Sequence, residues 1–342
     1  MRVVPRAVRT ALARAAPVRA AAALALLGLS SCTAGADLGD DGRLKVVSTV
    51  APITSIVSAV VGDGADITGV VPEGSDSHTF EPAPSMAKVL ARADVIFVNG
   101  LQLEDPTLEL AERNKGSRAR IVRLGDSVLA PQDHIFDFSF PERDGKPNPH
   151  LWTDPGYARR YAEVVRDTMV AVDPAGGDRY RRNYDAFSAR VDALDAALRA
   201  ALDTVSPQHR KLLTYHDAYA YFARSYGWKV IGAIQVQDFQ DPTPREVARL
   251  IEQVKAEGVP AIFGSEVFPS PVLAKIGRAA GVAYVDVLRD DDLPGRPGDP
   301  EHSWLGLMRF DYLTIVRSLG GDPSALEALS VDGPPDRAVY PQ

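Results

Sequence analysis

The chain of 342 residues contains a single cysteine, so it can form neither an intramolecular disulfide nor a metal site built from several cysteines. The chain also has fewer basic than acidic residues, because it contains 38 Lys and Arg and 45 Asp and Glu, which give a net charge of −7. Phosphate binding needs clustered Lys and Arg, so this balance argues against a nucleic-acid partner. The length and the 45% hydrophobic content indicate a folded chain of about two domains.

Three catalytic motifs are absent as well. The sequence contains no His-Glu-x-x-His zinc-protease motif, no Gly-x-Ser-x-Gly nucleophile elbow and no Walker A phosphate loop. We therefore expect neither serine-hydrolase chemistry nor ATP hydrolysis by this chain, and we predict that it is not an enzyme.

The N-terminal segment has the layout of a secretory signal. Residues 1–31 contain five Arg and no acidic residue, and the apolar run at 20–28 is too short to span a bilayer. Leu-Ser-Ser and then Cys32 follow this run, and they resemble a bacterial lipobox. The resemblance implies cleavage before Cys32 and lipidation of that cysteine, which would hold the mature chain outside the cytoplasmic membrane. Residues 32–43 are small and polar, so they are expected to form a flexible tether.

The remainder of the chain alternates short β-branched segments with helical patterns, in two series. Strands are expected at 44–50, 66–71, 94–99 and 120–124, and again at 211–215, 229–234, 261–263 and 283–288. Strand–helix alternation of this kind predicts parallel sheets. The predicted fold is therefore α/β, with two similar lobes that each contain a parallel sheet flanked by helices.

A long amphipathic helix is predicted between the two series. Its apolar residues recur at steps of three and four from Tyr180 to Leu202, and Pro207 ends it. We interpret it as a rigid spine that joins the lobes. The expected organisation is a signal peptide, tether, N-terminal lobe, spine, C-terminal lobe and tail, at 1–31, 32–43, 44–173, 174–206, 207–320 and 321–342.

Three of the six histidines lie where a parallel sheet forms its ligand crevice. His78 follows the second predicted strand, His150 precedes a helix, and His216 ends the first strand of the second series. The crevice of an open parallel sheet lies outside the carboxyl ends of its strands. Imidazole is the commonest protein ligand for borderline divalent metals, so these three residues are candidate ligands.

The segments around these histidines resemble the three histidine motifs of the zinc/manganese solute-binding lipoproteins of bacterial ABC transporters. The segments are Ser77–Pro82, Asn148–Pro155 and Thr214–Phe222. The resemblance extends from Leu44 to about Gly320. It implies one metal ion bound between the two lobes, with His78 and His150 from the first lobe and His216 from the second.

The same family implies a fourth ligand, a carboxylate in the loop after the last strand of the second lobe. That loop carries three consecutive acids, and the family pattern fits Asp291 best. Asp290 and Asp292 remain alternatives, with a solvated acidic turn as the explanation for the acids that do not bind. Glu266 lies one position away from a carboxylate that is common in the family, so it is a candidate to contact the metal ligands without binding the metal itself.

The other histidines are expected to have no role at the metal. His134 lies in a long acidic loop, His209 lies in a connection and is expected to be exposed, and His302 precedes the helix-capping Ser303.

Three imidazoles and one carboxylate favour zinc, which prefers four tetrahedral N, O or S ligands. Manganese prefers more oxygen ligands, and in the family a Glu at the position of His216 accompanies manganese. We therefore expect one Zn²⁺ in preference to Mn²⁺. A manganese-binding member of the same family is the alternative.

The resemblance also implies the partners. A monomer would capture the ion outside the membrane and deliver it to an ABC permease with its cytoplasmic ATPase. Two other classes are a zinc-dependent hydrolase, which would need an open coordination position, and a surface adhesin that uses its outer face.

Overall fold

The computed structural model describes residues 42–234, 242–265 and 270–341. The predicted signal peptide, Cys32 and Glu266 therefore lie outside the described residues. None of the helices in the described ranges combines the length and the hydrophobicity that a membrane span requires.

The first half of the described chain builds a parallel four-stranded sheet in the order β2-β1-β3-β4. Its strands are β1 Leu44–Ser48, β2 Ala65–Gly69, β3 Val95–Val98 and β4 Arg120–Arg123. The helices of this half are α1 Ala51–Val61, α2 Met86–Arg92, α3 Asp105–Asn114, α4 Leu124–Val128 and α5 Pro155–Val172.

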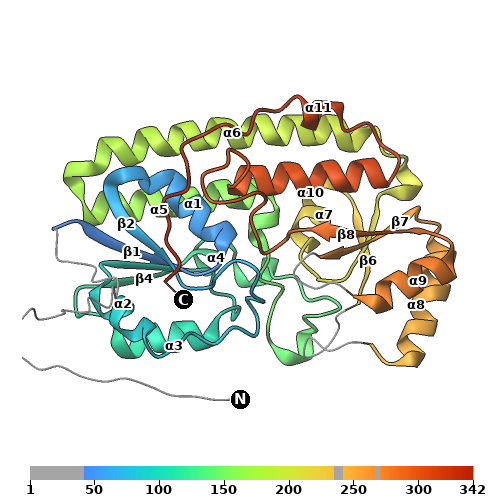
Figure 1. Cartoon of the computed structure of the whole chain (residues 1–342), viewed down its shortest axis with the longest axis horizontal. Helices are drawn as coiled ribbons and strands as arrows, with labels where there is room; N and C mark the ends of the chain where they lie inside the picture. The colour runs from blue at the N-terminus through green and yellow to red at the C-terminus, as the bar shows by residue number, and fades with distance from the viewer. Residues whose placement is uncertain (1–41, 235–241, 266–269, 342) are drawn as a thin grey trace, which may run out of the picture. The chain divides into compact units, whose positions relative to one another are not determined.

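The second half repeats this arrangement with the order β6-β5-β7-β8, again all parallel. Its strands are β5 Lys211–Thr214, β6 Lys229–Ala233, β7 Ala261–Ser265 and β8 Ala283–Leu288. Its helices are α7 Ala220–Tyr226, α8 Pro244–Glu257, α9 Pro271–Ala280, α10 Trp304–Ser318 and α11 Ser324–Glu327. Figure 1 shows the two sheets with their helices, which confirms the predicted α/β fold of two similar lobes.

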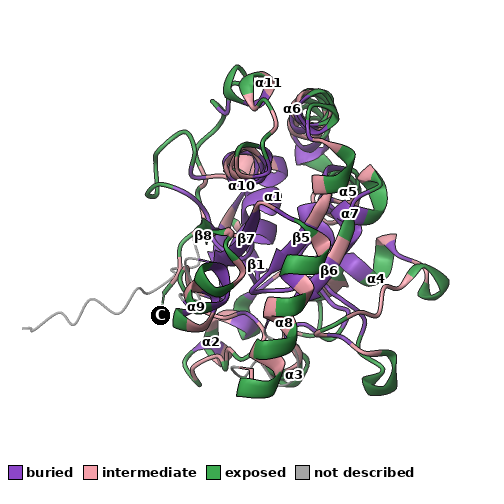
Figure 2. Cartoon of the chain, turned by 90° about the vertical axis from the view of Figure 1, so that its right-hand side faces the viewer, coloured by how far each residue is buried: buried purple, intermediate pink, exposed green. Residues whose placement is uncertain are grey.

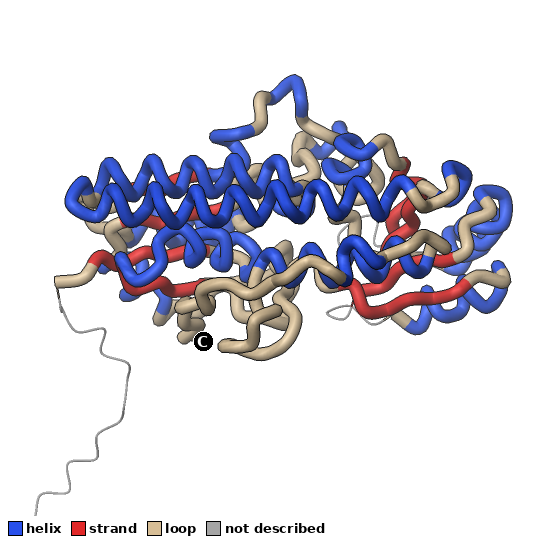
Figure 3. The backbone as a smooth tube through the Cα atoms, turned by 90° about the horizontal axis from the view of Figure 1, so that it is seen from above, coloured by secondary structure: helices blue, strands red, loops and turns tan. Residues whose placement is uncertain are grey.

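The predicted spine is the single helix α6 Gly177–Asp203, which runs past both sheets (Figures 1 and 3). It contacts α1 and α5 of the first half and α10 and α11 of the second. Its apolar stripe is buried as expected, except that Tyr184 is only half-buried and lies under the guanidinium of Arg166, 4.3 Å away. Most strand residues are buried and the helices expose their outer faces, as Figure 2 shows.

The sheets share one continuous hydrophobic core. Val46 and Phe97 of the first sheet belong to the same buried cluster as Leu212 and Phe263 of the second. A hydrogen bond also joins the halves, since the Trp304 backbone N–H at the start of α10 donates to Ser55 Oγ on α1 at 2.9 Å. A rigid-body rotation of one sheet away from the other would therefore break packed apolar contacts.

Helices α5, α8 and α10 each begin with a side chain that caps the backbone. Asp154 accepts from the Tyr157 backbone at the start of α5, and Ser303 accepts from Gly306 at the start of α10. Thr243 and Glu246 form a reciprocal capping box with Pro244 as the first helical residue of α8.

The C-terminal tail returns to the first sheet, a feature that the sequence analysis did not anticipate. The Val339 N–H donates to Ile67 O at 3.0 Å, and the Gly69 N–H donates to Val339 O at 2.9 Å. The tail thus adds a short parallel bridge to β2, which is an edge strand. Tyr340 packs directly on Gly69, where an added Cβ would lie 2.0 Å from the tyrosine ring.

This contact predicts the effect of Gly69→Ala. The new methyl group cannot share the space with the Tyr340 ring, so the tail should detach from β2 while the sheet remains folded. We expect faster trypsin cleavage after the exposed Arg337, because proteases cut segments that open locally. Gly116→Ala is the matched control, since its added Cβ would only approach Ala91 O, at 3.4 Å. Equal cleavage rates in both variants would contradict the predicted detachment.

Candidate metal centre

The four predicted ligands all follow strands or precede a helix, as expected. His78 lies in the loop after β2, and His216 lies two residues beyond the end of β5. His150 immediately precedes the short turn Leu151–Thr153 that leads into α5, and Asp291 lies three residues beyond β8. The carboxyl ends of parallel strands share one edge of a sheet, which places His78 at that edge of the first sheet and places His216 and Asp291 at that edge of the second.

The structure brings the four side chains together. The Nε2 atom of His150 lies 3.0 Å from that of His78 and 2.8 Å from that of His216. One donor atom from each of His78, His150, His216 and Asp291 lies within 4.8 Å of all the others. His78 is partly exposed and the other three are buried. Three nitrogens and one oxygen thus surround a space of the size that one metal ion requires.

Two properties of His150 suit it to bind a cation. Its Nδ1–H donates to Asn148 Oδ1 at 2.8 Å, and because an amide oxygen only accepts, the lone pair of the ring is on Nε2. Burial, followed by the charges of His216 and His78, keeps the pKa of His150 well below its usual value. The ring is therefore neutral and presents its acceptor nitrogen to the other two histidines.

Asp291 is held by a neighbour of His78. Ser77 Oγ donates to Asp291 Oδ2 at 2.6 Å, and among the described residues Oδ1 has no hydrogen-bond partner. Burial raises the pKa of Asp291 to about 6, although the charge of His216 acts to lower that pKa. One oxygen is thus fixed by the protein and the other is available to a cation.

A second layer of polar groups lies behind the histidines, and sequence reasoning missed it. Asn148 Nδ2 donates to Asp137 Oδ2 at 2.9 Å and to the Asp217 carbonyl at 2.7 Å. Burial, followed by the charge of the neighbouring Asp217, raises the pKa of Asp137, so this carboxyl group keeps its proton at neutral pH. The only available signal was the position of Asp217 directly after His216, which does not reveal a partner that lies 80 residues earlier.

The acidic loop is fixed by hydrogen bonds from both halves. Trp152 Nε1 donates to the Asp290 carbonyl at 2.8 Å, and the Arg289 N–H donates to Asp311 Oδ1 on α10 at 3.0 Å. Asp292 turns back to its own loop, where its Oδ1 accepts from the Leu293 N–H. The side chain of Asp290 lies 3.8 Å from His216 Nε2.

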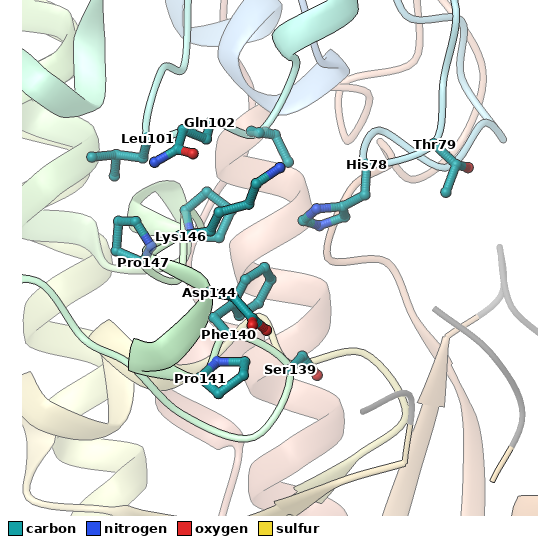
Figure 4. A pocket seen from close by; sticks show the side chains of 12 residues that line it. His78, Thr79, Leu101, Gln102, Ser139, Phe140, Pro141, Asp144, Lys146 and Pro147 are labelled. Atoms are coloured by element: carbon teal, nitrogen blue, oxygen red, sulfur yellow. The ribbon is translucent and has the colours of Figure 1, made fainter. Parts of the chain in front are cut away.

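A cavity of about 440 Å³ opens beside His78. His78 forms one wall, and Phe140, Pro141 and Lys146 lie across from it (Figure 4). Because His78 is also the one partly exposed member of the four-residue group, this cavity connects the group to solvent.

The three remaining histidines lie elsewhere. His134 is half-buried against Phe136, and the prediction that His209 is exposed is wrong, because its ring is half-buried with Nδ1 3.2 Å from Leu319 O. His302 is buried, and its Nε2 lies 2.9 Å from Glu73 in the loop that leads to His78.

The chain matches the ZnuA family, described as "Zinc-uptake complex component A periplasmic", over residues 46–318. It is 28% identical to the iron-binding protein YfeA of Yersinia pestis, over 89% of this chain and 97% of that protein. It is 27% identical to the manganese-binding lipoprotein MntA of Halalkalibacterium halodurans, over 82% and 90%. The solved structure of the periplasmic zinc-binding protein TroA from Treponema pallidum shares the fold, with a TM-score of 0.73 and 24% identity over 81% of this chain and 99% of that one.

The fold and the convergent histidines define a two-lobed solute-binding protein. More particularly, the chain belongs to the ZnuA family, as the resemblance of its histidine motifs predicted. Members of this family are metal-binding components of ABC transporters and are not enzymes, which confirms the prediction that this chain is not an enzyme.

The hydrogen bond from Ser77 predicts the effect of Ser77→Ala. Without this donor the Asp291 carboxylate loses its fixed orientation, and loss of such an outer partner weakens metal affinity by about 10- to 100-fold. Metal competition titrations would measure this change. Ser75→Ala is the matched control in the same loop, because none of the described hydrogen bonds uses the Ser75 hydroxyl. Equal affinities in the two variants would contradict the role of Ser77.

The His302–Glu73 pair predicts a pH-dependent contribution to stability. Burial alone would lower the pKa of His302, but Glu73 outweighs it and the pKa is raised. The folded protein then holds this proton more tightly than the unfolded chain, so the pair stabilises the fold below pH ~6.5 and the contribution is lost as pH rises through the raised pKa. With a chelator present throughout, the Tm of the wild type should exceed that of His302→Gln most at acidic pH. A Tm difference that is independent of pH would refute this prediction.

Proposed function

We propose that this protein binds a divalent transition metal ion outside the cytoplasmic membrane and delivers it to the permease of an ABC transporter. The observation that carries the proposal is the convergence of His78, His150, His216 and Asp291, with one donor atom of each within 4.8 Å of the others. All four proposed ligands come from one chain, so a monomer suffices. The sequence similarity to metal-binding relatives extends over most of this chain and of each relative, and it supports the same function.

Zinc is the ion that we favour for this site. Three neutral imidazole nitrogens and one carboxylate oxygen form the set that zinc takes in tetrahedral sites. For a given nitrogen and oxygen site, zinc also binds more tightly than manganese or iron(II) by the Irving–Williams order. The relatives named for iron and manganese make those two ions the alternatives.

The cavity beside His78 provides the route for the ion. His150, His216 and Asp291 are buried, whereas His78 is reached from the cavity. An ion would therefore meet His78 first on entry and leave it last on release.

The lipid anchor at Cys32 is part of the proposal. The relative in Halalkalibacterium halodurans is itself a lipoprotein, and the lipobox-like segment of this chain is in the expected place. An anchored protein stays within a tether's length of the membrane in which its permease resides.

Metal binding by the purified protein tests the function. We expect one tightly bound Zn²⁺ per chain in competition titrations, with weaker Mn²⁺ binding. His216→Ala removes one of the four ligands and should lower zinc affinity by about 100-fold or more, since the loss of an outer partner already costs about 10- to 100-fold.

His134→Ala is the matched control, because His134 lies outside the four-residue group. It should bind zinc like the wild type. Zinc binding by His216→Ala that equals the wild type would refute the ligand assignment. A wild-type protein that binds none of Zn²⁺, Mn²⁺ and Fe²⁺ would refute the function.

A further inference from the structure

Asp290 has a buried carboxylate that the fold itself does not use. Its side chain is 2% exposed, and among the described residues neither oxygen has a hydrogen-bond partner. Burial raises the pKa of Asp290, and His216 and then the Ser265 hydroxyl oppose this rise, although the Ser265 contact lacks hydrogen-bond geometry. The loop is fixed instead through the Asp290 backbone, whose carbonyl accepts from Trp152. An unpartnered carboxylate in such a position is costly unless something compensates it.

The surroundings of Asp290 point to the compensating group. Its only ion-pair contact within the described ranges is to His216 Nε2, at 3.8 Å, and none of the described ion pairs joins it to Lys or Arg. Two atoms that bind the same ion through bonds of about 2.1 Å lie about 3 to 4 Å apart, so this distance is compatible with a shared ion. Asp290 lies outside the group of four whose donor atoms are all within 4.8 Å, so direct ligation requires its carboxylate to turn toward the ion from its place beside His216 when the ion binds.

We propose that Asp290 is a fifth protein ligand of the bound ion, next to His216 and in addition to Asp291. This inference rests on the proposed metal-binding function. With Asp290, the site would contain three imidazole nitrogens and two carboxylates. The two negative charges of the carboxylates would neutralise a divalent cation in this buried site.

A second carboxylate changes which ions the site accepts. Zinc is satisfied by four ligands, whereas manganese and iron(II) prefer more oxygens and a higher coordination number. Asp290 would therefore contribute more to the binding of Mn²⁺ than of Zn²⁺. With Asp290 as a ligand, the site would prefer Zn²⁺ over Mn²⁺ by less than the other four proposed ligands alone would give.

The experiment compares Asp290→Asn with Asp292→Asn. Both variants replace one buried acid of the same loop, but the Asp292 side chain bonds within the loop, to the Leu293 N–H. We expect Asp290→Asn to weaken Mn²⁺ binding by about tenfold or more and Zn²⁺ binding by less, because even an outer partner is worth about 10- to 100-fold. Asp292→Asn should leave the ratio of the two affinities unchanged.

Two further measurements separate ligation from a structural role. The metal-free Tm of Asp290→Asn should equal or exceed that of the wild type, because an unpartnered buried acid is removed. X-ray absorption of the unsubstituted protein loaded with Mn²⁺ should show at least five ligands, and one oxygen fewer in the variant.

The outcomes distinguish this inference from the function on which it rests. If the wild type binds neither ion, the proposed function fails. If the wild type binds both ions but Asp290→Asn behaves like Asp292→Asn, or absorption shows one carboxylate and no fifth protein ligand, the role of Asp290 is overturned and the function stands.

Discussion

The proposed function depends on three imidazoles and a carboxylate that the fold holds close together. Nitrogen atoms only 2.8 to 3.0 Å apart would repel one another if the rings were protonated, and burial keeps the pKa of His78 and His150 low. The hydrogen bonds of Asn148 and Ser77 orient the site from behind. The cation-binding geometry is thus maintained by groups that do not themselves face the ion.

The continuous core explains how ligands from two sheets keep such close distances. Apolar residues of both sheets pack in one cluster, and α6 contacts helices of both halves. Parts that share a close-packed core do not separate without exposing apolar surface. The loop that carries His78 is partly exposed, whereas residues 290–293 are buried and held by hydrogen bonds from both halves, so the His78 loop is the part of the site that can change at lower cost.

Much of the architecture was predictable because it is encoded locally. β-Branched segments between helical patterns marked all eight strands, and Thr243 with Glu246 marked the start of α8. The positions of the three histidines near strand ends made them candidate ligands, and the resemblance of their motifs to a known family implied one shared site. The proximity of Asp137 to Asp217 and the bridge from Val339 to β2 were not predictable, since each joins residues whose sequence separation carries no periodic signal.

The sequence alone does not determine which of the three acids in the 290–292 loop faces the histidines. The side chains of consecutive residues after a strand point in different directions. Only the folded structure reveals which of the three acids faces the histidines. Asp291 does so with one oxygen fixed by Ser77, Asp292 returns to its own loop, and Asp290 lies against His216 without a hydrogen-bond partner among the described residues. A single carboxylate leaves a bound divalent cation with one uncompensated charge in a low-dielectric site, and a second one removes it. If Asp290 joins Asp291 at the ion as proposed, the number of carboxylates that this loop turns inward sets the charge of the loaded site, and with it the balance between ions that prefer nitrogen and ions that prefer oxygen.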